Sequence, residues 1–235
     1  MRNLRGTYVH RGDAARWRRR FNHVVFATGL MAATWYVVAH RKTASANAES
    51  VVQEKRTSIF SRAGETRKLR QELENARGEL ALVQAQYDRA NRIMQYSTRY
   101  EIGAGLAGKI FDGALREGVD PELAFRLVRL ESEFNHRATS NVGALGLMQL
   151  MPSTARHFVK GVTNEQLYDP DMNLKIGMKY LRTLIITYKG NVNLALLAYN
   201  RGDAAVDRDL QNGVNPGNGY DTHIMKGYKG KGLVD

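Results

Sequence analysis

Residues 130–154 form the stretch LESEFNHRATSNVGALGLMQLMPST, and this stretch carries the strongest signal for the fold. One acid, Glu131, stands near its start, followed by a run of small and polar residues that ends in Gly146-Leu147-Met148-Gln149. Glycines in such a run let the backbone approach a ligand closely. An acid followed by residues of this kind is typical of a carbohydrate-binding cleft.

The helix that carries Glu131 is predicted to begin at Asp120 and Pro121, because Asp is a favoured N-cap and Pro fits the first helical position. Leu127, Val128 and Glu131 follow at helical spacing, which places the carboxyl group on an apolar face. Burial disfavours the charged form of a carboxyl group. We therefore expect Glu131 to have a pKa high enough to donate a proton near neutral pH.

Glu133 provides a contrast within the same stretch. It lies about 200° around the helix from Glu131, on the side of Arg126 and Arg129, and we predict a solvated surface ion pair there. It is the only other carboxylate between residues 131 and 149. The two-carboxylate arrangement of most glycosidases is therefore not visible, and Glu131 is expected to act alone.

Three blocks of sequence occur in a fixed order. They are Glu131-Ser132, Phe134-Asn135, Ala138-Thr139-Ser140 and residues 143–152; then Leu167-Tyr168-Asp169-Pro170 with Asn173, Gly177 and Tyr180-Leu181; then Ala198-Tyr199-Asn200-Arg201-Gly202. Together they closely resemble the soluble lytic transglycosylase domain, a goose-lysozyme-like fold that cleaves peptidoglycan. The resemblance covers residues 101–228 and implies a mainly α-helical, lysozyme-like domain over residues 98–235. The one departure is Arg201, where the family usually has a small residue.

The resemblance implies that Glu131 is the sole acid and base of the reaction. It would protonate the β-1,4 glycosidic oxygen between N-acetylmuramic acid and N-acetylglucosamine, and then take a proton from the muramyl C6 hydroxyl group. The expected product is a 1,6-anhydromuramyl end, formed without water. The resemblance further implies substrate-binding positions, to which we add a tyrosine after a glycine-rich loop over residues 211–219: Ser140, Gln149, Met151, Tyr199, Asn200 and Tyr220.

Several of these positions are also compatible with a purely structural role. Met151, like Met148, is as compatible with core packing as with sugar contact. Tyr199 is compatible with packing alone, and Asn200 with a cap or a turn. The sequence contains no cysteine, nucleotide-binding loop or metal-ligand cluster, and its six histidines are scattered. We therefore expect no cofactor and no metal.

The N-terminal region has the composition of a membrane anchor. Residues 1–20 form a basic lead, and residues 21–39 are nineteen positions without Asp, Glu, Lys or Arg, about 28 Å long as a helix. Seven arginines precede this segment and only Arg41 and Lys42 follow it closely, which predicts a cytoplasmic N-terminus. The competing interpretation is a signal peptide cleaved near residues 44–46, but charged residues before that site favour an uncleaved anchor.

Two further segments precede the domain. Residues 40–61 are predicted to be a polar linker, and residues 62–97 a coiled coil or long amphipathic helix. The alternative for the second segment is a helix folded back on its own domain. Its apolar positions alternate four and three residues apart: Leu69, Leu73, Ala76, Leu80, Val83, Tyr87, Ala90 and Met94.

These features predict a single-pass protein of the bacterial inner membrane, with a periplasmic domain that acts on peptidoglycan glycan strands. The 69–94 heptad helix is expected to pair with a second copy or with other membrane proteins. Two alternatives stay open: a structural subunit of a larger membrane complex with a vestigial site, and a phage virion component that degrades the wall. Of the net charge of +12, residues 1–42 supply +8, so the domain is only mildly basic and no nucleic acid partner is expected.

Overall fold

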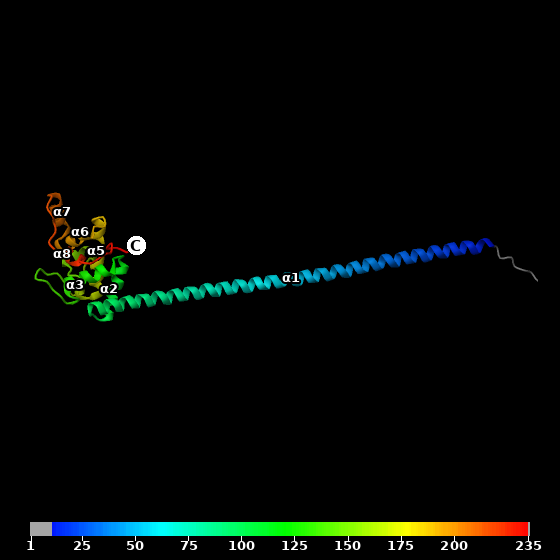
Figure 1. The fold of residues 1–235 in the computed structure, drawn as a ribbon, viewed down its shortest axis with the longest axis horizontal. Coiled ribbons are helices and arrows are strands. Elements are labelled where there is room, and N and C mark those ends of the chain that lie inside the picture. Colours follow the sequence, from blue (N-terminus) through cyan, green and yellow to red (C-terminus); the bar gives the residue numbers. More distant parts are fainter. Residues whose placement is uncertain (1–10, 235) are drawn as a thin grey trace, which may run out of the picture. The chain divides into compact units, whose positions relative to one another are not determined.

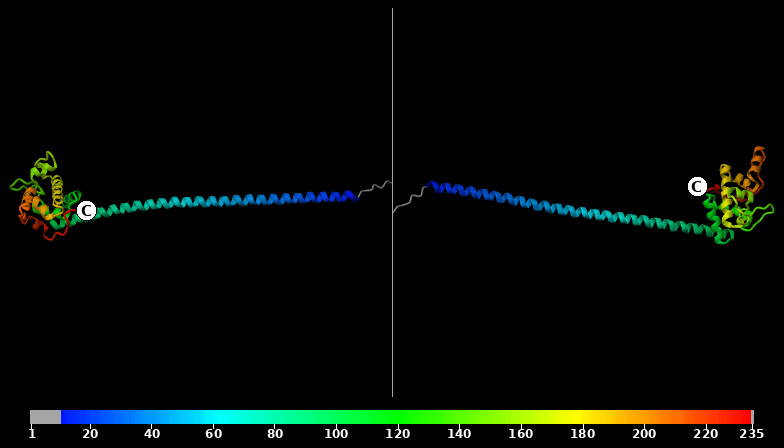
Figure 2. Two further views of the ribbon diagram at one scale, coloured as in Figure 1. Left: turned by 90° about the horizontal axis from the view of Figure 1, so that it is seen from above. Right: turned by 180° about the vertical axis from the view of Figure 1, so that it is seen from behind.

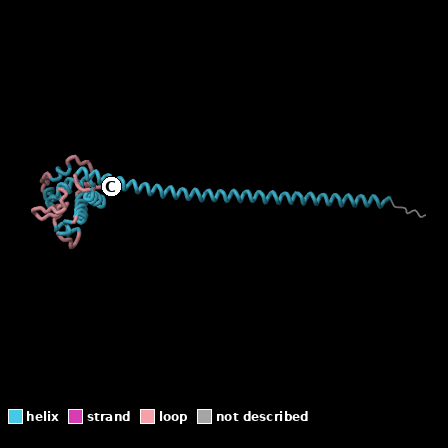
Figure 3. Tube along the Cα trace, turned by 90° about the horizontal axis from the view of Figure 1, so that it is seen from below, coloured by secondary structure: helices cyan, strands magenta, loops and turns pink. Residues whose placement is uncertain are grey.

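The computed structural model describes residues 11–234, apart from the side chains of residues 11–17 and 24. Residues 1–10 of the predicted basic lead lie outside the described residues. Helices dominate, as predicted, and within residues 11–234 there is no extended strand, only isolated bridges (Figure 3). The elements are α1 (Arg11–Tyr100), α2 (Ala104–Arg116), α3 (Pro121–Ser132), α4 (Pro152–Phe158), the 3-10 helix η1 (Glu165–Tyr168), α5 (Pro170–Thr187), α6 (Val192–Arg201), α7 (Asp203–Gln211) and α8 (Tyr220–Met225).

The chain divides into an N-terminal unit up to Leu80 and a C-terminal unit from Ala81. The described part of the N-terminal unit is helical throughout, as part of α1. The linker predicted over residues 40–61 is therefore helical as well, because this segment contains no Gly or Pro and is rich in residues with good helix propensity, such as Ala, Glu, Gln, Lys and Arg.

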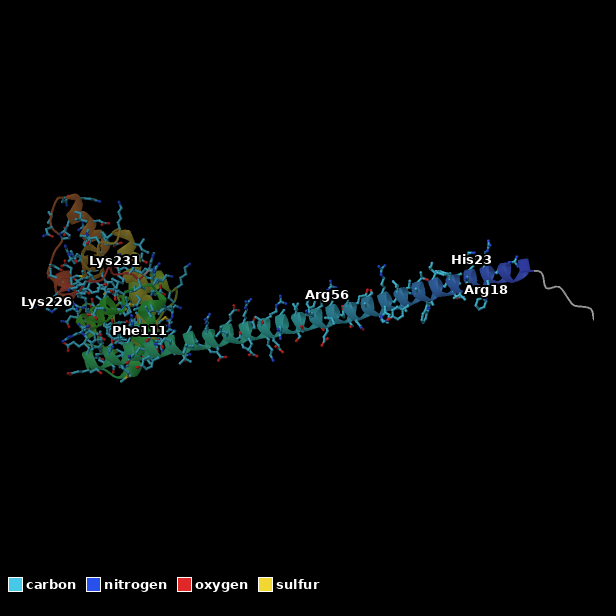
Figure 4. All side chains as sticks on the ribbon, turned by 45° about the vertical axis from the view of Figure 1, so that its right-hand side comes forward. Arg18, His23, Arg56, Phe111, Lys226 and Lys231 are labelled. Atoms are coloured by element: carbon cyan, nitrogen blue, oxygen red, sulfur yellow. The ribbon has the colours of Figure 1, made fainter. Side chains whose placement is uncertain are left out.

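The apolar segment predicted over residues 21–39 is exposed along α1. Phe26, Leu30 and Trp35 are between 68% and 75% exposed, and Figure 4 shows side chains standing off the helix between the labelled Arg18 and Arg56. By length and composition, α1 contains one candidate membrane span near its N-terminal end.

The C-terminal unit is built around α5, which packs against α2, α4 and α6 (Figures 1 and 2). One stripe of α5 is apolar and lies in the core, since Leu174, Met178, Leu181 and Ile185 are all buried. Helix α5 stops at Thr187, and Gly190 with φ 84° turns the chain away.

The last turns of α1 belong to the same core. Ile93 is buried, and the Tyr96 ring stacks on Phe125 with ring centroids 4.1 Å apart. Arg89 Nε donates to Asp112 Oδ1 over 2.8 Å. The packed part of the chain therefore begins several residues before residue 98, where the predicted domain starts.

Candidate active site

Glu131 lies in the last turn of α3, and the N-terminus of that helix forms as predicted. Asp120 is the N-cap, its Oδ1 accepts from the Glu122 N–H over 2.9 Å, and Pro121 is the first helical residue. Leu127 and Val128, four and three residues before Glu131, are fully buried. The helix thus carries the carboxyl group on its apolar face, at the edge of the core.

Burial raises the pKa of Glu131 from its ordinary value of 4.5 to about 7, although a hydrogen bond from the Tyr220 hydroxyl group to Oε1 lowers it. No cation pairs with this carboxyl group among the described residues. A group with a pKa near 7 is present in both protonation states at neutral pH. Glu131 can therefore donate a proton and later accept one.

The raised pKa of Glu131 makes the free energy of unfolding depend on pH. Below about pH 4.5 the carboxyl group is protonated in both the folded and the unfolded chain, so Glu131 does not lower the free energy of unfolding there. As the pH rises toward 7, the unfolded chain ionises first, so the free energy of unfolding falls and then stays lower. Above pH 7 the folded protein holds a carboxylate in a place that disfavours it.

Two tyrosines surround the acid and both remain protonated. Burial and, after it, the charge of Glu131 raise the pKa values of Tyr199 and Tyr220 well above 10. The Tyr199 hydroxyl group donates to the Met148 carbonyl oxygen over 2.8 Å. Tyr199 therefore joins α6 to the 143–150 segment, and Tyr220 is the direct partner of the carboxyl group.

Ser140 and Gln149, two of the predicted sugar contacts, hold the loop beside Glu131. Ser140 Oγ accepts from the Ala144 N–H over 2.9 Å. Gln149, with φ 45°, donates from Nε2 to the carbonyl oxygens of Gly146 (2.9 Å) and Ala138 (3.2 Å). Its Oε1 makes no hydrogen bond within residues 11–234, so this atom is left for a ligand.

The two methionines have different environments. Met148 is fully buried and packs so tightly on Gly177 that a Cβ atom there would approach its sulfur to 2.3 Å. Met148 is therefore core, which is one of the two roles open to it from the sequence. Met151, the N-cap of α4, is 38% exposed and so stays available for contact with a ligand.

Asn173 was not predicted as a site residue, yet it fixes the position of the whole loop. It is completely buried on α5, its Nδ2 donates to the carbonyl oxygens of Leu145 and Leu167, and its Oδ1 accepts from the Met148 N–H, all within 2.9 Å. A Cβ atom at Gly146 would lie 2.3 Å from Nδ2, so only glycine fits there. The available signal was a polar residue inside the apolar stripe of α5.

Ser132 makes a second link between α3 and this loop. Its Oγ is buried and donates to the Leu147 carbonyl oxygen over 2.8 Å or to that of Val128 over 3.1 Å. Because Ser132 directly follows Glu131, the link fixes the end of the helix at the place where the acid emerges.

Arg201, the departure from the family pattern, has a structural explanation. Its guanidinium group donates to the Pro216 carbonyl oxygen over 2.6 Å and pairs with Asp209 at 2.8 Å. Asn200 accepts a hydrogen bond from Asn218 over 2.9 Å. These contacts attach the loop after α7 to α6. Tyr220, which directly follows this loop, is thereby held where its hydroxyl group reaches Glu131.

The prediction for Glu133 was wrong in its partners. Helix α3 ends at Ser132, so Glu133 lies beyond it with φ 50° and is exposed. Arg126 pairs with Glu122 at 2.7 Å instead, because Glu122 lies one turn before it on the same face. Arg126, Arg129 and Glu133 line a separate groove of about 880 Å³.

Among the described residues, no three or more His, Cys, Asp or Glu side chains form a group that could hold a metal ion. The polar groups described at the site are one carboxyl group, two neutral tyrosines and the amide groups of Gln149 and Asn200.

Comparison with known proteins relates this domain to a family. Residues 108–218 match the family model described as Transglycosylase SLT domain. A transglycosylase of Enterobacteria phage PRD1 is 51% identical over 84 residues, which is 36% of this chain and 30% of that protein. The soluble lytic murein transglycosylase of Escherichia coli K12 is 40% identical over 95 residues, 38% and 15% of the two chains. The membrane-bound lytic murein transglycosylase C of Edwardsiella ictaluri is 34% identical over 130 residues, 45% and 36%.

This chain thus spans only about a third or less of the first two of these relatives. Among solved structures, the lytic transglycosylase Slt of Pseudomonas aeruginosa matches with a TM-score of 0.44 and 30% identity, over 49% of this chain and 21% of that one. The 70 kDa soluble lytic transglycosylase of Escherichia coli matches with a TM-score of 0.44 and 28% identity, over 60% and 28%.

Replacing Asn173 is expected to destabilise the C-terminal unit. Asn173→Leu leaves the Leu167 carbonyl oxygen and the Met148 N–H without a partner and the Leu145 carbonyl oxygen with only the Leu150 N–H, so the free energy of unfolding should fall by about 3 kcal/mol. Denaturant unfolding of the full chain measures the change. The matched control is Asn193→Leu on the exposed side of α6, which should change stability by less than about 0.5 kcal/mol. Equal effects of the two substitutions would contradict the role of Asn173.

Proposed function

We propose that this chain, whose residues 108–218 match the Transglycosylase SLT domain model, is a peptidoglycan lytic transglycosylase that uses Glu131 as its only acid and base. The observation that carries the proposal is the partly buried carboxyl group of Glu131, which has a pKa of about 7, two neutral tyrosines beside it and no cationic partner among residues 11–234. An unpaired buried carboxyl group costs stability, and such perturbed groups are concentrated at functional sites.

The proposed reaction has two proton transfers. First, the protonated Glu131 gives its proton to the glycosidic oxygen between N-acetylmuramic acid and N-acetylglucosamine, and the bond from the muramyl C1 to that oxygen breaks. The muramyl ring then carries oxocarbenium-like charge at C1, and Glu131 is a carboxylate. Second, the carboxylate takes the proton of the C6 hydroxyl group as its oxygen bonds to C1. The product is a 1,6-anhydromuramyl end, water is not consumed, and Glu131 is again protonated.

The surrounding residues have proposed roles that follow from their contacts. Tyr220 stabilises the carboxylate between the two steps, because its hydroxyl group already donates to Oε1. Gln149 presents an unbonded amide oxygen, and Met151 an exposed thioether side chain, to the sugars. Ser140, Tyr199 and Asn200 act mainly by holding the loops, with sugar contact as an additional role of Asn200, which is exposed.

The alternative of a structural subunit with a vestigial site is less well supported, because such a subunit would gain stability by losing the unpaired acid. The second candidate is a phage virion component with the same chemistry. It is favoured by the relative from phage PRD1, which is named a transglycosylase. The reaction and its product would be the same in both settings.

The activity can be tested with the full chain and purified peptidoglycan. Mass spectrometry of the released muropeptides should show anhydromuramyl ends, and Glu131→Gln should lower their rate of release by at least about 100-fold, the usual contribution of a general acid. Glu133→Gln, two residues further on and exposed, is the matched control and should retain full activity. Reducing ends would show a hydrolase instead, and no release by the folded protein would refute the enzymatic proposal.

We further propose that residues 21–39 of α1 anchor the chain in the inner membrane, with the N-terminus in the cytoplasm and the C-terminal unit in the periplasm. Support comes from the exposed apolar side chains, the arginines that precede the segment, and the candidate span in α1. A membrane anchor also gives these side chains an apolar environment.

The anchor is tested by alkaline extraction of membranes from cells that express the full chain. The wild-type chain should stay in the membrane, and Leu30→Arg with Ala33→Arg should release most of it, because each charge near the bilayer centre costs about 3 kcal/mol. The same two charges at Ser45 and Ser50, outside the segment, should have no effect. Release of the wild-type chain would contradict the anchor.

A further inference from the structure

A second part of α1 also leaves its apolar side chains uncovered. Leu69, Leu73, Leu80, Val83 and Tyr87 are between 51% and 67% exposed. These residues follow the predicted membrane segment by about thirty positions, so a bilayer that covers residues 21–39 does not cover them.

The apolar residues keep the four-and-three spacing of a two-stranded coiled coil without interruption. Taking Leu73 as position a, the a positions are Leu73, Leu80, Tyr87 and Met94, and the d positions are Leu69, Ala76, Val83 and Ala90. In a coiled coil these positions form the seam between the helices. Both glycines of the region, Gly64 and Gly78, fall at position f, which is the position farthest from the seam.

The charges beside this seam distinguish the two possible orientations of a partner. The g positions carry Glu65, Glu72 and Glu79, and the e positions that follow five residues later carry Arg70, Arg77 and Gln84. In a parallel pair, g of one helix meets the following e of the other, so Glu65 meets Arg70 and Glu72 meets Arg77. In an antiparallel pair, g meets g and e meets e, which brings like charges together.

Within the C-terminal unit, Val83, Tyr87 and Met94 of the seam stay exposed. The last turns of α1 pack on the core through Ile93, Tyr96 and Arg89, which occupy the c and g positions of the same repeat. The centre of that side lies about 110° around the helix from the centre of the seam. Over residues 83–94, one face of α1 therefore packs on the core while the neighbouring face stays exposed.

The helix also needs a partner for its own stability. A glycine in a helix interior costs about 1 kcal/mol relative to alanine, and α1 contains Gly64 and Gly78 with nothing within 4 Å of either Cβ position. The i,i+4 ion pair Lys68–Glu72 is 3.9 Å long and highly exposed, so it contributes little. Most helix stability in proteins comes from the packing of an apolar face.

We propose that α1 forms a parallel, in-register, two-stranded coiled coil with a second copy of this chain, with Leu69 to Met94 as the seam and Glu65–Arg70 and Glu72–Arg77 as pairs between the copies. The complementary charges at the g and e positions occur in the same sequence, so two copies of this chain can supply both partners of each ion pair. This inference does not depend on the proposed enzymatic activity or on the anchor, although a parallel pair places two anchors at the same end.

Disulfide cross-linking of the full chain in detergent tests the seam and its orientation, since the chain has no natural cysteine. Leu73→Cys and Leu80→Cys, made separately, should each give covalent dimers on mild oxidation. An antiparallel pair centred at Leu73 would hold the two copies of position 80 about 21 Å apart, too far for a disulfide. Gln71→Cys, at outer position f, is the matched control and should give few dimers.

Charge exchange tests the pairing independently of cysteine chemistry. The double variant Arg70→Glu with Arg77→Glu should lose self-association, as should Glu65→Arg with Glu72→Arg, because each puts like charges beside the seam. Mixing the two variants should restore pairing, seen as differently tagged chains that co-purify. Circular dichroism of each variant shows whether α1 has remained helical.

The results separate the outcomes clearly. Cross-linking at both Leu73 and Leu80 together with recovery in the mixture supports the parallel dimer. Three results would each overturn it: a monomeric wild-type chain, cross-linking at only one of the two positions, or self-association that the charge variants do not change. A wild-type chain that pairs only with a different membrane protein would also overturn the dimer.

Discussion

The structure of the C-terminal unit depends on placing one carboxyl group at the edge of an apolar core without a cation to balance it. Leu127 and Val128 are buried in the core, and Glu131 lies on the same face of α3, so its carboxyl group is held at the edge of the core. Burial at this position disfavours the charged form and raises the pKa of Glu131 to about 7. Tyr220, which lies 89 residues later in the chain, limits the cost by donating a hydrogen bond.

Several backbone polar groups of the loops around the acid are hydrogen-bonded by uncharged side chains, which leaves the carboxyl group of Glu131 without a balancing charge. The Asn173 side chain donates hydrogen bonds to two backbone carbonyl oxygens and accepts one from a backbone N–H group. The Ser132 hydroxyl group donates to another backbone carbonyl oxygen. Arg201 fixes the segment that carries Tyr220. The tyrosine hydroxyl is the one protein hydrogen bond donor that meets the carboxyl group among the described residues, which keeps its proton available for transfer.

Local signals were sufficient to predict the start of the α3 helix and the acid that it carries. Asp120 and Pro121 begin α3, and Glu131 stands on the apolar face of this helix. Contacts between distant segments could not be predicted, because spacing along the chain contains no information about them. The role of Asn173, the anchoring by Arg201 and the burial of Ile93 are of this kind. The predicted partners of Glu133 were wrong because the helix ends one residue before it.

The central claim is that Glu131 stays protonated up to neutral pH, and the most direct test is to titrate its carboxyl group. Carbon-13 NMR of the full chain with labelled glutamate carboxyl groups follows this titration, and the signal that is absent in Glu131→Gln identifies the residue. The structure predicts a midpoint at about pH 7, well above that of the exposed Glu133. A midpoint near the ordinary value of 4.5 would contradict the account, since an acid already ionised at neutral pH has no proton to donate.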